Sequence, residues 1–178
     1  MSSIKELAPF ILKWEGGFVN HKYDRGGATN KGVTLKVWQK LGFDNDKDGD
    51  VDLQDLILIT DNQATQIMAK GYWDDWQADK IENQAVANTL VDFAWGSGTK
   101  TSILLIQRLL GLKADGVVGQ QTLKALNTAN PKDLLEKIYA FRINFLKSIV
   151  QRNATQKVFL KGWLNRMNDL INYNKKWL

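Results

Sequence analysis

Residues 14–34 read WEGGFVNHKYDRGGATNKGVT and combine five glycines with very few acidic side chains. Glu15 directly follows Trp14, and Asp24 and then Thr29 come later in the same segment. Glycine adopts backbone conformations that other residues avoid, so a cluster of glycines is typical of tight turns. We therefore expect a loop or a short hairpin here, in which the chain turns back after Glu15.

Helical periodicity dominates the sequence on both sides of this segment. Ile4, Leu7 and Ile11 recur at helical intervals ahead of Glu15, although Pro9 removes one backbone donor there. The same apolar spacing predicts further helices at 34–42, 52–59, 61–69, 83–95, 99–111, 120–127, 131–150 and 157–173. The sequence thus predicts a mainly α fold with at most a small β-hairpin at residues 17–34.

Length and composition narrow the class of protein. A chain of 178 residues is long enough to bury one sizeable core. The absence of cysteine excludes disulfides, thiolate metal sites and cysteine nucleophiles. No apolar run is long enough to span a bilayer, and residues 1–17 lack the pattern of a secretory signal. If the protein acts outside the cytoplasm, we expect a delivery route other than a standard signal peptide.

The positive charge is concentrated near the C-terminus. Residues 131–178 carry ten Lys/Arg against three Asp/Glu, whereas residues 1–130 carry fourteen against sixteen. A basic region of this kind suggests a polyanionic partner, namely nucleic acid, a membrane surface or an anionic cell-wall polymer. Nucleic acid is the least favoured partner because aromatic RNA-binding signatures and zinc-finger spacings are absent. A merely solvated basic helix face is the alternative interpretation.

Residues 44–55, DNDKDGDVDLQD, have the spacing of a calcium-binding loop. Calcium takes about six to eight oxygen ligands, and an EF-hand loop supplies them at fixed positions around a central glycine, here Gly49. The candidate ligands are Asp44, Asp46, Asp48, Asp50, Asp52 and Asp55. The last ligand is Asp rather than the usual Glu, so the loop looks more like a dockerin loop. We expect a structural calcium ion; a solvated acidic turn and a calcium-regulated interaction protein are the alternatives.

The acidic residues of segment 14–34 suit glycosidic cleavage. Such hydrolysis usually needs one protonated carboxylic acid and a second carboxylate that activates water or stabilises the oxocarbenium ion. Glu15 ends an apolar helix, an environment that suits the acid. Asp24 lies across the glycine loop, and Thr29 could help to hold a water molecule. From the residues alone, a purely structural glycine loop remains the competing interpretation.

The segment closely resembles the signature of the glycoside hydrolase family 108 N-acetylmuramidases. That signature runs E-G-G-(Y/F)-x-N-x-x-x-D-x-G-G-x-T-x-x-G-(I/V)-T. The matching residues are Glu15, Gly16, Gly17, Phe18, Asn20, Asp24, Gly26, Gly27, Thr29, Gly32, Val33 and Thr34. Three later segments resemble further elements of the family: GYWDDW at 71–76, LVDFAWGSG at 90–98 and FLKGWLNRM at 159–167. IQRLLGLKADGVVGQQTLKAL at 106–126 is similar to helical peptidoglycan-binding modules.

The resemblance implies both an architecture and an activity. It implies a lysozyme-like catalytic region at 1–98, which contains the acidic loop, and a helical peptidoglycan-binding region at 99–178. The activity would be hydrolysis of the β-1,4 bond between N-acetylmuramic acid and N-acetylglucosamine. Glu15 would be the general acid, with Asp24 and Thr29 positioning the water or stabilising the transition state. Substrate contacts are expected at Asn20, Tyr72, Trp73 and Asp92, for the last three of which packing or capping roles are the alternatives.

The resemblance also implies how the protein meets its substrate. We expect a monomer that binds peptidoglycan, without nucleic acid, membrane insertion or a catalytic cofactor. Release through a phage holin, or non-classical export from a bacterium, would bring it to the cell wall. A non-catalytic cell-wall-binding protein and a lytic transglycosylase are the alternative functions.

Overall fold

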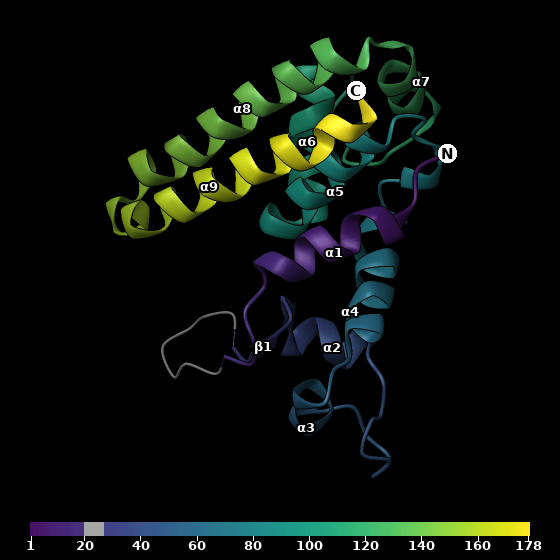
Figure 1. Ribbon diagram of the computed structural model, residues 1–178, viewed down its shortest axis with the longest axis vertical. Coiled ribbons are helices and arrows are strands. Elements are labelled where there is room, and N and C mark those ends of the chain that lie inside the picture. Colours follow the sequence, from purple (N-terminus) through teal and green to yellow (C-terminus); the bar gives the residue numbers. More distant parts are fainter. Residues whose placement is uncertain (20–26) are drawn as a thin grey trace. The chain divides into compact units, whose positions relative to one another are not determined.

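The computed structural model describes residues 1–19 and 27–178, which form two compact units (Figure 1). The N-terminal unit spans Ile4–Asp74, and the C-terminal unit combines Met1–Ser3 with Asp75–Leu178. Among the described residues, strands occur only as one short antiparallel pair, and helices make up most of both units. The predicted mainly α fold with a small hairpin is therefore confirmed.

The N-terminal unit is built on the packing of its first and fourth helices. Its elements are α1 (Ile4–Trp14), β1 (Thr29–Asn30), β2 (Val33–Thr34), α2 (Leu35–Leu41), α3 (Leu53–Ile57), α4 (Asp61–Met68) and the π-helix η1 (Ala69–Trp73). Helix α1 continues through Pro9 and packs against α4. The buried side chains of these two helices are Leu7, Ala8, Phe10, Ile11, Ala64, Ile67 and Met68. This apolar contact fixes the C-terminal end of α1, where Glu15 follows.

A glycine directs the chain from α2 into the acidic loop. Trp38 of α2 is fully buried, and the backbone N–H of Gly42 donates to its carbonyl at 2.6 Å. A Cβ atom at position 42 would overlap the Trp38 ring. Only glycine therefore lets the backbone pass this close to the indole before the loop begins.

The C-terminal unit surrounds one central helix. Its elements are η2 (Ala78–Lys80), α5 (Gln84–Ser97), α6 (Thr99–Leu109), α7 (Gln120–Thr128), α8 (Pro131–Arg152), η3 (Ala154–Gln156), α9 (Lys157–Asn174) and η4 (Lys175–Trp177). Every residue at positions 84–94 of α5 is buried, and α5 packs against α6, α8 and α9. α5 is therefore the central helix of this unit, and its buried polar residues need partners within the unit.

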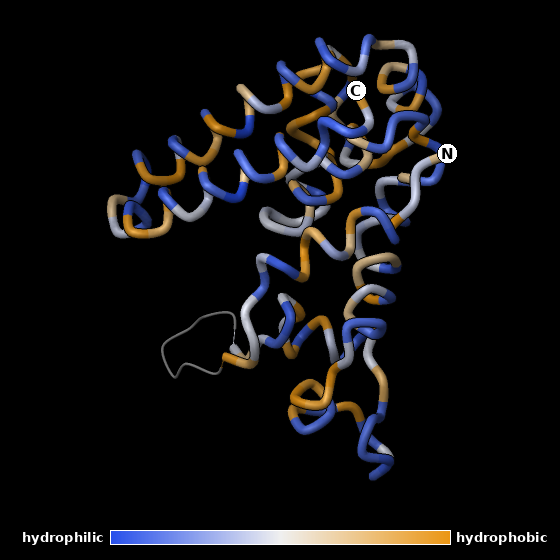
Figure 2. The backbone as a smooth tube through the Cα atoms, in the orientation of Figure 1, coloured by the Kyte–Doolittle hydropathy of each residue, from blue (hydrophilic) through white to orange (hydrophobic). Residues whose placement is uncertain are grey.

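Helices α8 and α9 form a long antiparallel pair (Figure 1). Apolar and polar residues alternate along both helices, as Figure 2 shows, so each buries one stripe and exposes the other. Across residues 1–19 and 27–178, none of the helices combines the length and the apolar character that crossing a membrane requires.

Polar side chains inside the C-terminal unit are paired with one another. Asn88 of α5 donates to the Asn174 side-chain oxygen of α9 at 3.0 Å. The Asn174 amide in turn donates to the hydroxyls of Thr89 and Tyr139, each at 3.0 Å. Because an unpaired buried polar group is costly, this network fixes the register of α5 against α9.

The two compact units divide at a different place from the predicted boundary. The family resemblance implies a boundary between residues 98 and 99, whereas the compact units divide between Asp74 and Asp75. The difference arises because α5 packs against α6, α8 and α9, although it precedes all three in the chain. By compactness, α5 therefore belongs with the C-terminal helices.

Candidate functional site

Glu15 lies directly after the last residue of α1. Its backbone N–H donates to the carbonyls of Ile11 at 3.1 Å and Leu12 at 3.3 Å, so the residue continues the helical hydrogen bonding. The side chain is half-buried, and Gly16 and Gly17 follow in exposed positions. The backbone of Glu15 is thus held at the end of α1, and the two glycines that follow add no bulky side chains beside it.

A two-residue hairpin brings Thr29 back toward the segment after Glu15. Lys31 and Gly32 both have positive φ, 47° and 75°, and form the turn between β1 and β2. Positive φ at both central positions is typical of the type I′ turn that suits the strand twist. Val19 and Thr29 exchange two backbone hydrogen bonds of 2.8 Å each. Glu15 and Thr29 therefore belong to one small substructure.

Asn20 and Asp24, two residues of the predicted site, lie outside the described residues. The structure describes the chain on both sides of them, up to Val19 and again from Gly27. The hydroxyl of Thr29, which is half-buried, lies 3.5 Å from the Gly27 carbonyl. The roles predicted for Asn20 and Asp24 stay predictions.

Asn30 connects this hairpin to the helix that follows the acidic loop. Its side chain is buried, and its Nδ2 donates to the carbonyls of Leu56 at 2.9 Å and Ile57 at 3.1 Å. Both acceptors lie at the C-terminal end of α3, where helical carbonyls lack intrahelical partners. A change in the position of α3 is therefore transmitted directly to β1.

The acidic loop at 44–55 folds around its own carboxylates. Asp44 accepts hydrogen bonds from the backbone N–H groups of Lys47 at 2.6 Å and Gly49 at 3.1 Å. Asp55 is fully buried and accepts from the backbone N–H groups of Asn45, Asp46 and Asp52. Two groups of three have carboxylate oxygens within 4.8 Å of one another: Asp44, Asp46 and Asp48, and Asp50, Asp52 and Asp55.

The electrostatics of the loop separate Asp55 from its neighbours. Backbone hydrogen bonds, first from Asp52 and then from Asn45 and Asp46, hold the pKa of Asp55 below its ordinary value. The pKa of Asp50 is raised, chiefly by the charge of Asp48. Local desolvation, together with the charges of neighbouring aspartates, raises the pKa of Asp46. Such mutual repulsion is what a bound cation would relieve.

Asp92 lies in a buried ion cluster. Its side chain is 1% exposed; Oδ2 accepts from Arg142 at 2.7 Å and Oδ1 from Arg166 at 2.8 Å. Burial alone would raise the pKa of Asp92, but the two guanidinium groups outweigh it and hold that pKa below its ordinary value. Both carboxylate oxygens are thus engaged, and this geometry favours a structural role over the predicted substrate contact.

The aromatic residues of GYWDDW are mostly buried. Trp73 is 2% exposed and Trp76 is fully buried, with its indole N–H donating to Ser102 at 3.3 Å. Tyr72 lies in η1 and is half-buried. In this structure Trp73 has no accessible ring face for a sugar, so packing accounts for it and substrate contact is disfavoured. A contact at Tyr72 stays a prediction.

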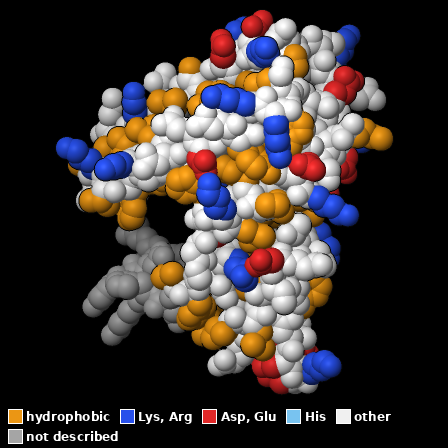
Figure 3. Space-filling model, in the orientation of Figure 1, with side chains coloured by type: hydrophobic (Ala, Val, Ile, Leu, Met, Phe, Trp, Pro, Cys, Tyr) orange, Lys and Arg blue, Asp and Glu red, His pale blue; other side chains and the backbone are white. Residues whose placement is uncertain are grey.

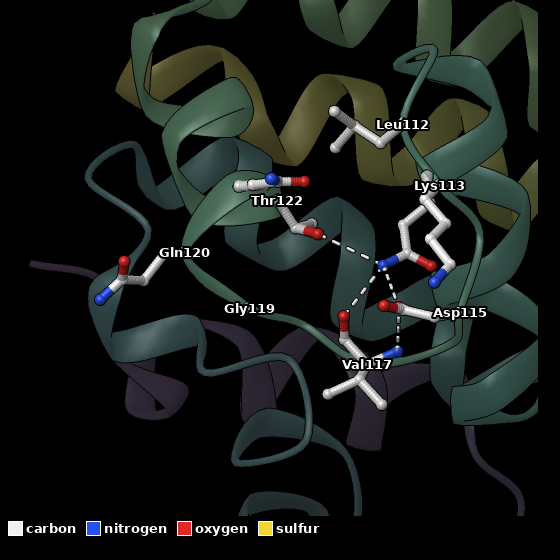
Figure 4. Close-up of a pocket in the computed structure, with 9 residues that line it drawn as sticks. Leu112, Lys113, Asp115, Val117, Gly119, Gln120 and Thr122 are labelled. Atoms are coloured by element: carbon white, nitrogen blue, oxygen red, sulfur yellow. Dashed lines mark hydrogen bonds between the residues drawn. The ribbon is translucent and has the colours of Figure 1, made fainter.

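The turn at Asp115–Gly116, here called the DG turn, borders a small open pocket of about 230 Å³ (Figure 4). Its lining residues are Gln107, Leu112, Lys113, Asp115, Val117, Gly119, Gln120, Gln121 and Thr122. The buried Gln107 amide donates to Asp115 and to the Val117 carbonyl, both at 2.9 Å. The Val117 N–H and then the Gln107 amide hold the pKa of Asp115 below its ordinary value. Asp115 thus serves first as a turn-forming residue.

Comparison with known proteins gives matches in both parts of the chain. Residues 8–98, just over half of the chain, match the family model of glycosyl hydrolase 108. The chain belongs to this family. Residues 101–168 match a predicted peptidoglycan domain. The solved structure of Brucella abortus SagA is similar over 98% of this chain and 94% of that chain, with 27% identity and a TM-score of 0.80. A search of curated proteins gave no match.

For this glycosyl hydrolase 108 chain, the two family matches support glycoside hydrolase activity directed at peptidoglycan. The first match includes Glu15 and Thr29, which the hairpin brings into one substructure. It also includes the acidic loop and Asp92. The second match includes the pocket at the DG turn.

Sequence reasoning missed two residues of the glycosyl hydrolase 108 chain that organise its C-terminal unit. Arg142 pairs with Asp92, and Gln107 holds the DG turn. Arg142 falls at helical spacing after the buried Leu135 and Ile138, so a cation on an apolar helix face was the available signal. For Gln107 the available signal was its place in segment 106–126, which is similar to helical peptidoglycan-binding modules, although that similarity does not indicate which turn the side chain holds.

Proposed function

We propose that the protein is an N-acetylmuramidase that hydrolyses the β-1,4 bond between N-acetylmuramic acid and N-acetylglucosamine in peptidoglycan. The observation that carries the proposal is Glu15, held at the end of packed α1 and followed by the glycine-rich hairpin of a glycosyl hydrolase 108 chain. The peptidoglycan domain match at 101–168 supports the substrate class.

Glu15 would act as the general acid. Its carboxylic acid proton passes to the glycosidic oxygen as the bond to the anomeric carbon breaks, so the leaving sugar departs as a neutral alcohol. Asp24 and Thr29 would position the attacking water or stabilise the oxocarbenium-like transition state. The pairing of Thr29 with Val19 supports a common location with Glu15, because Val19 lies four residues beyond the acid. Asn20 and Tyr72 would contact the substrate.

We propose that calcium stabilises the N-terminal unit without entering the chemistry. The two groups of close carboxylates and the EF-hand spacing support this proposal, and Asn30 offers a path from α3 to the hairpin. The residues that would hold the ion are Asp44, Asp46, Asp48, Asp50, Asp52 and Asp55. A calcium-regulated interaction protein would instead show a large conformational change on calcium binding.

The proposed site of action is the bacterial cell wall. The protein would act as a monomer on the bacterial cell wall, and would reach it through a holin or by non-classical export. The basic C-terminal region, which carries ten Lys/Arg against three Asp/Glu over residues 131–178, would assist contact with the anionic wall. Nucleic acid and membrane insertion have no part in this proposal.

Mass spectrometry of the fragments released from purified peptidoglycan tests the proposed reaction. A muramidase leaves N-acetylmuramic acid at the new reducing ends, and these ends can be reduced with borohydride. Products with 1,6-anhydro ends would show a lytic transglycosylase instead. Binding without any released fragment would show a cell-wall-binding protein that retains the fold.

A further inference from the structure

The first two turns of α9 expose an aromatic surface that the fold itself does not use. Phe159 is 53% exposed, and its ring centroid lies 6.0 Å from that of Trp163, with the two planes inclined by only 26°. The two residues are one helical turn apart and therefore lie on the same face of α9. We refer to Phe159 and Trp163 together as the aromatic platform.

Open space surrounds the backbone next to this platform. Gly162 lies inside α9, where glycine is less favourable than alanine, yet a Cβ atom there would meet no atom of residues 1–19 and 27–178 within 4 Å. The pairs Asn88–Asn174 and Asp92–Arg166 show that α5 and α9 run antiparallel. One turn beyond Asp92, α5 carries Gly96, which has equally open surroundings. Internal packing therefore does not explain either glycine, and a ligand could approach both backbones.

The stretch of sequence around the platform is rich in positive charge. Residues 137–168 contain seven Lys/Arg and no Asp/Glu. Arg142 and Arg166 pair with the buried Asp92, and the other five cationic side chains are exposed: Lys137, Lys147, Arg152, Lys157 and Lys161. Figure 3 shows apolar and basic side chains gathered side by side at the turn between α8 and α9.

We propose that the aromatic platform, which lies within the residues that match a peptidoglycan domain, binds the glycan strand of peptidoglycan. The apolar face of a pyranose ring would stack on the aromatic rings, and Gly162 would let the sugar approach the helix backbone. The exposed cations of residues 137–168 would attract the carboxylates of the peptide stems at longer range. The proposal rests on the proposed function, because that function supplies peptidoglycan as the substrate.

The same observations argue against a lipid surface as the partner. A helix that lies in a membrane interface needs a broad apolar face. The apolar face of α9 is already buried against α5 and α8 through residues such as Met167 and Leu170. Only the platform and Val158 remain, which suits one or two sugar rings better than an acyl layer.

Co-sedimentation with purified peptidoglycan sacculi tests this surface in the full chain. All variants carry Glu15→Gln, so that the sacculi remain intact and binding is measured apart from turnover. Phe159→Ala is expected to weaken binding about tenfold, the usual effect of removing an aromatic anchor. Phe159→Tyr retains the ring and should bind like the parent.

Val158→Ser is the matched control, because Val158 is 76% exposed and adjacent to Phe159 but points away from it on the helix. Unchanged binding in a folded Phe159→Ala protein would overturn the proposal. So would an equal loss in Val158→Ser, or a preference for phosphatidylglycerol vesicles over sacculi. If the wild type binds sacculi through the platform but releases no fragments, the proposed enzymatic function fails while this surface stands.

Discussion

Among single residues, Asp92 is the one whose replacement has the clearest expected effect on stability. It is the only carboxylate between Arg142 and Arg166 in the described cluster, and it is 1% exposed. Asp92→Asn removes the charge and leaves two cations close together, which typically costs about 3–5 kcal/mol in a buried pair. We expect a corresponding fall in the unfolding free energy by urea denaturation. Asp61→Asn, which breaks only the exposed pair with Lys31, should cost about 0–1 kcal/mol.

The same residue predicts a dependence of stability on pH. The folded-state pKa of Asp92 lies below the ordinary value of 3.8, so folding favours its charged form. Its contribution is complete above that ordinary value and is lost as pH falls through the lowered pKa. The wild type should therefore lose stability on acidification more steeply than Asp92→Asn. Parallel slopes for the two proteins would contradict this account of the cluster.

Substitutions at Asp24 and Thr29 test the catalytic roles proposed for these two residues in addition to Glu15. If they hold a water molecule, Asp24→Asn should lose most of the wall-clearing activity and Thr29→Ala a smaller part, with the melting temperature little changed. Loss of one general base or positioning group typically costs about 10²–10⁴-fold in rate. If both variants are strongly destabilised but their folded fraction keeps the wild-type specific activity, the glycine-rich segment has only a structural role.

Residue types alone do not distinguish structural from functional roles here. Asp92 and Trp73 both fit a sugar-binding cleft by composition, yet the structure buries them. The partners of Asp92 lie 50 and 74 residues away in sequence, so no local pattern identifies them. Glu15, in contrast, occupies the end of α1 as the apolar periodicity predicts, because the helix and the glycines that follow are local features.

At the scale of elements, the acidic loop is the part whose behaviour should depend most on solution conditions. A cation that binds only the folded state adds about 2.7 kcal/mol at a hundredfold excess over its Kd. In a chain of this size that corresponds to a rise in melting temperature of roughly 5–10 °C. We therefore expect chelation to lower the melting temperature by this amount, with activity retained at low temperature. Asp46→Ala combined with Asp48→Ala should reproduce the effect of the chelator.

The calcium effect should shrink as the pH is lowered. The pKa values of Asp46 and Asp50 are raised, so both carboxylates take up protons at a higher pH than ordinary aspartates do. Protons then compete with the cation, and the calcium-free loop loses its repulsion. If titration calorimetry detects no calcium binding and the melting curve is the same with and without calcium, the proposed calcium site is wrong. If well-folded, calcium-free protein loses turnover, the calcium ion is needed for activity and not only for stability.

Most elements were predictable because their signals are local. The caps of α4 and α8, at Thr60 and Asn130, and the apolar periodicity place the helices to within a few residues. The hairpin follows from glycines at 26, 27 and 32. The π-helix η1, which ends at the buried Trp73, has no comparable local signal in the sequence.

At the scale of the whole molecule, the sequence families and the compact units divide the chain differently. The family matches meet near residue 100, whereas the units divide after Asp74. Helix α5 lies between these two points, so the glycosyl hydrolase 108 match includes the central helix of the C-terminal unit. The peptidoglycan domain match lies wholly within the C-terminal unit, whereas the glycosyl hydrolase 108 match extends over both units, so we expect both to be needed for activity.

The clearing of peptidoglycan suspensions by Glu15→Gln tests directly whether Glu15 is the general acid. The substitution retains the size and shape of the side chain but removes the proton that the leaving oxygen needs. We predict a loss of at least about 10²–10⁴-fold in the clearing rate, with binding to sacculi and melting temperature unchanged. Glu136→Gln, an exposed substitution on α8, should clear like the wild type. Clearing by Glu15→Gln at a rate near that of the wild type would contradict the account.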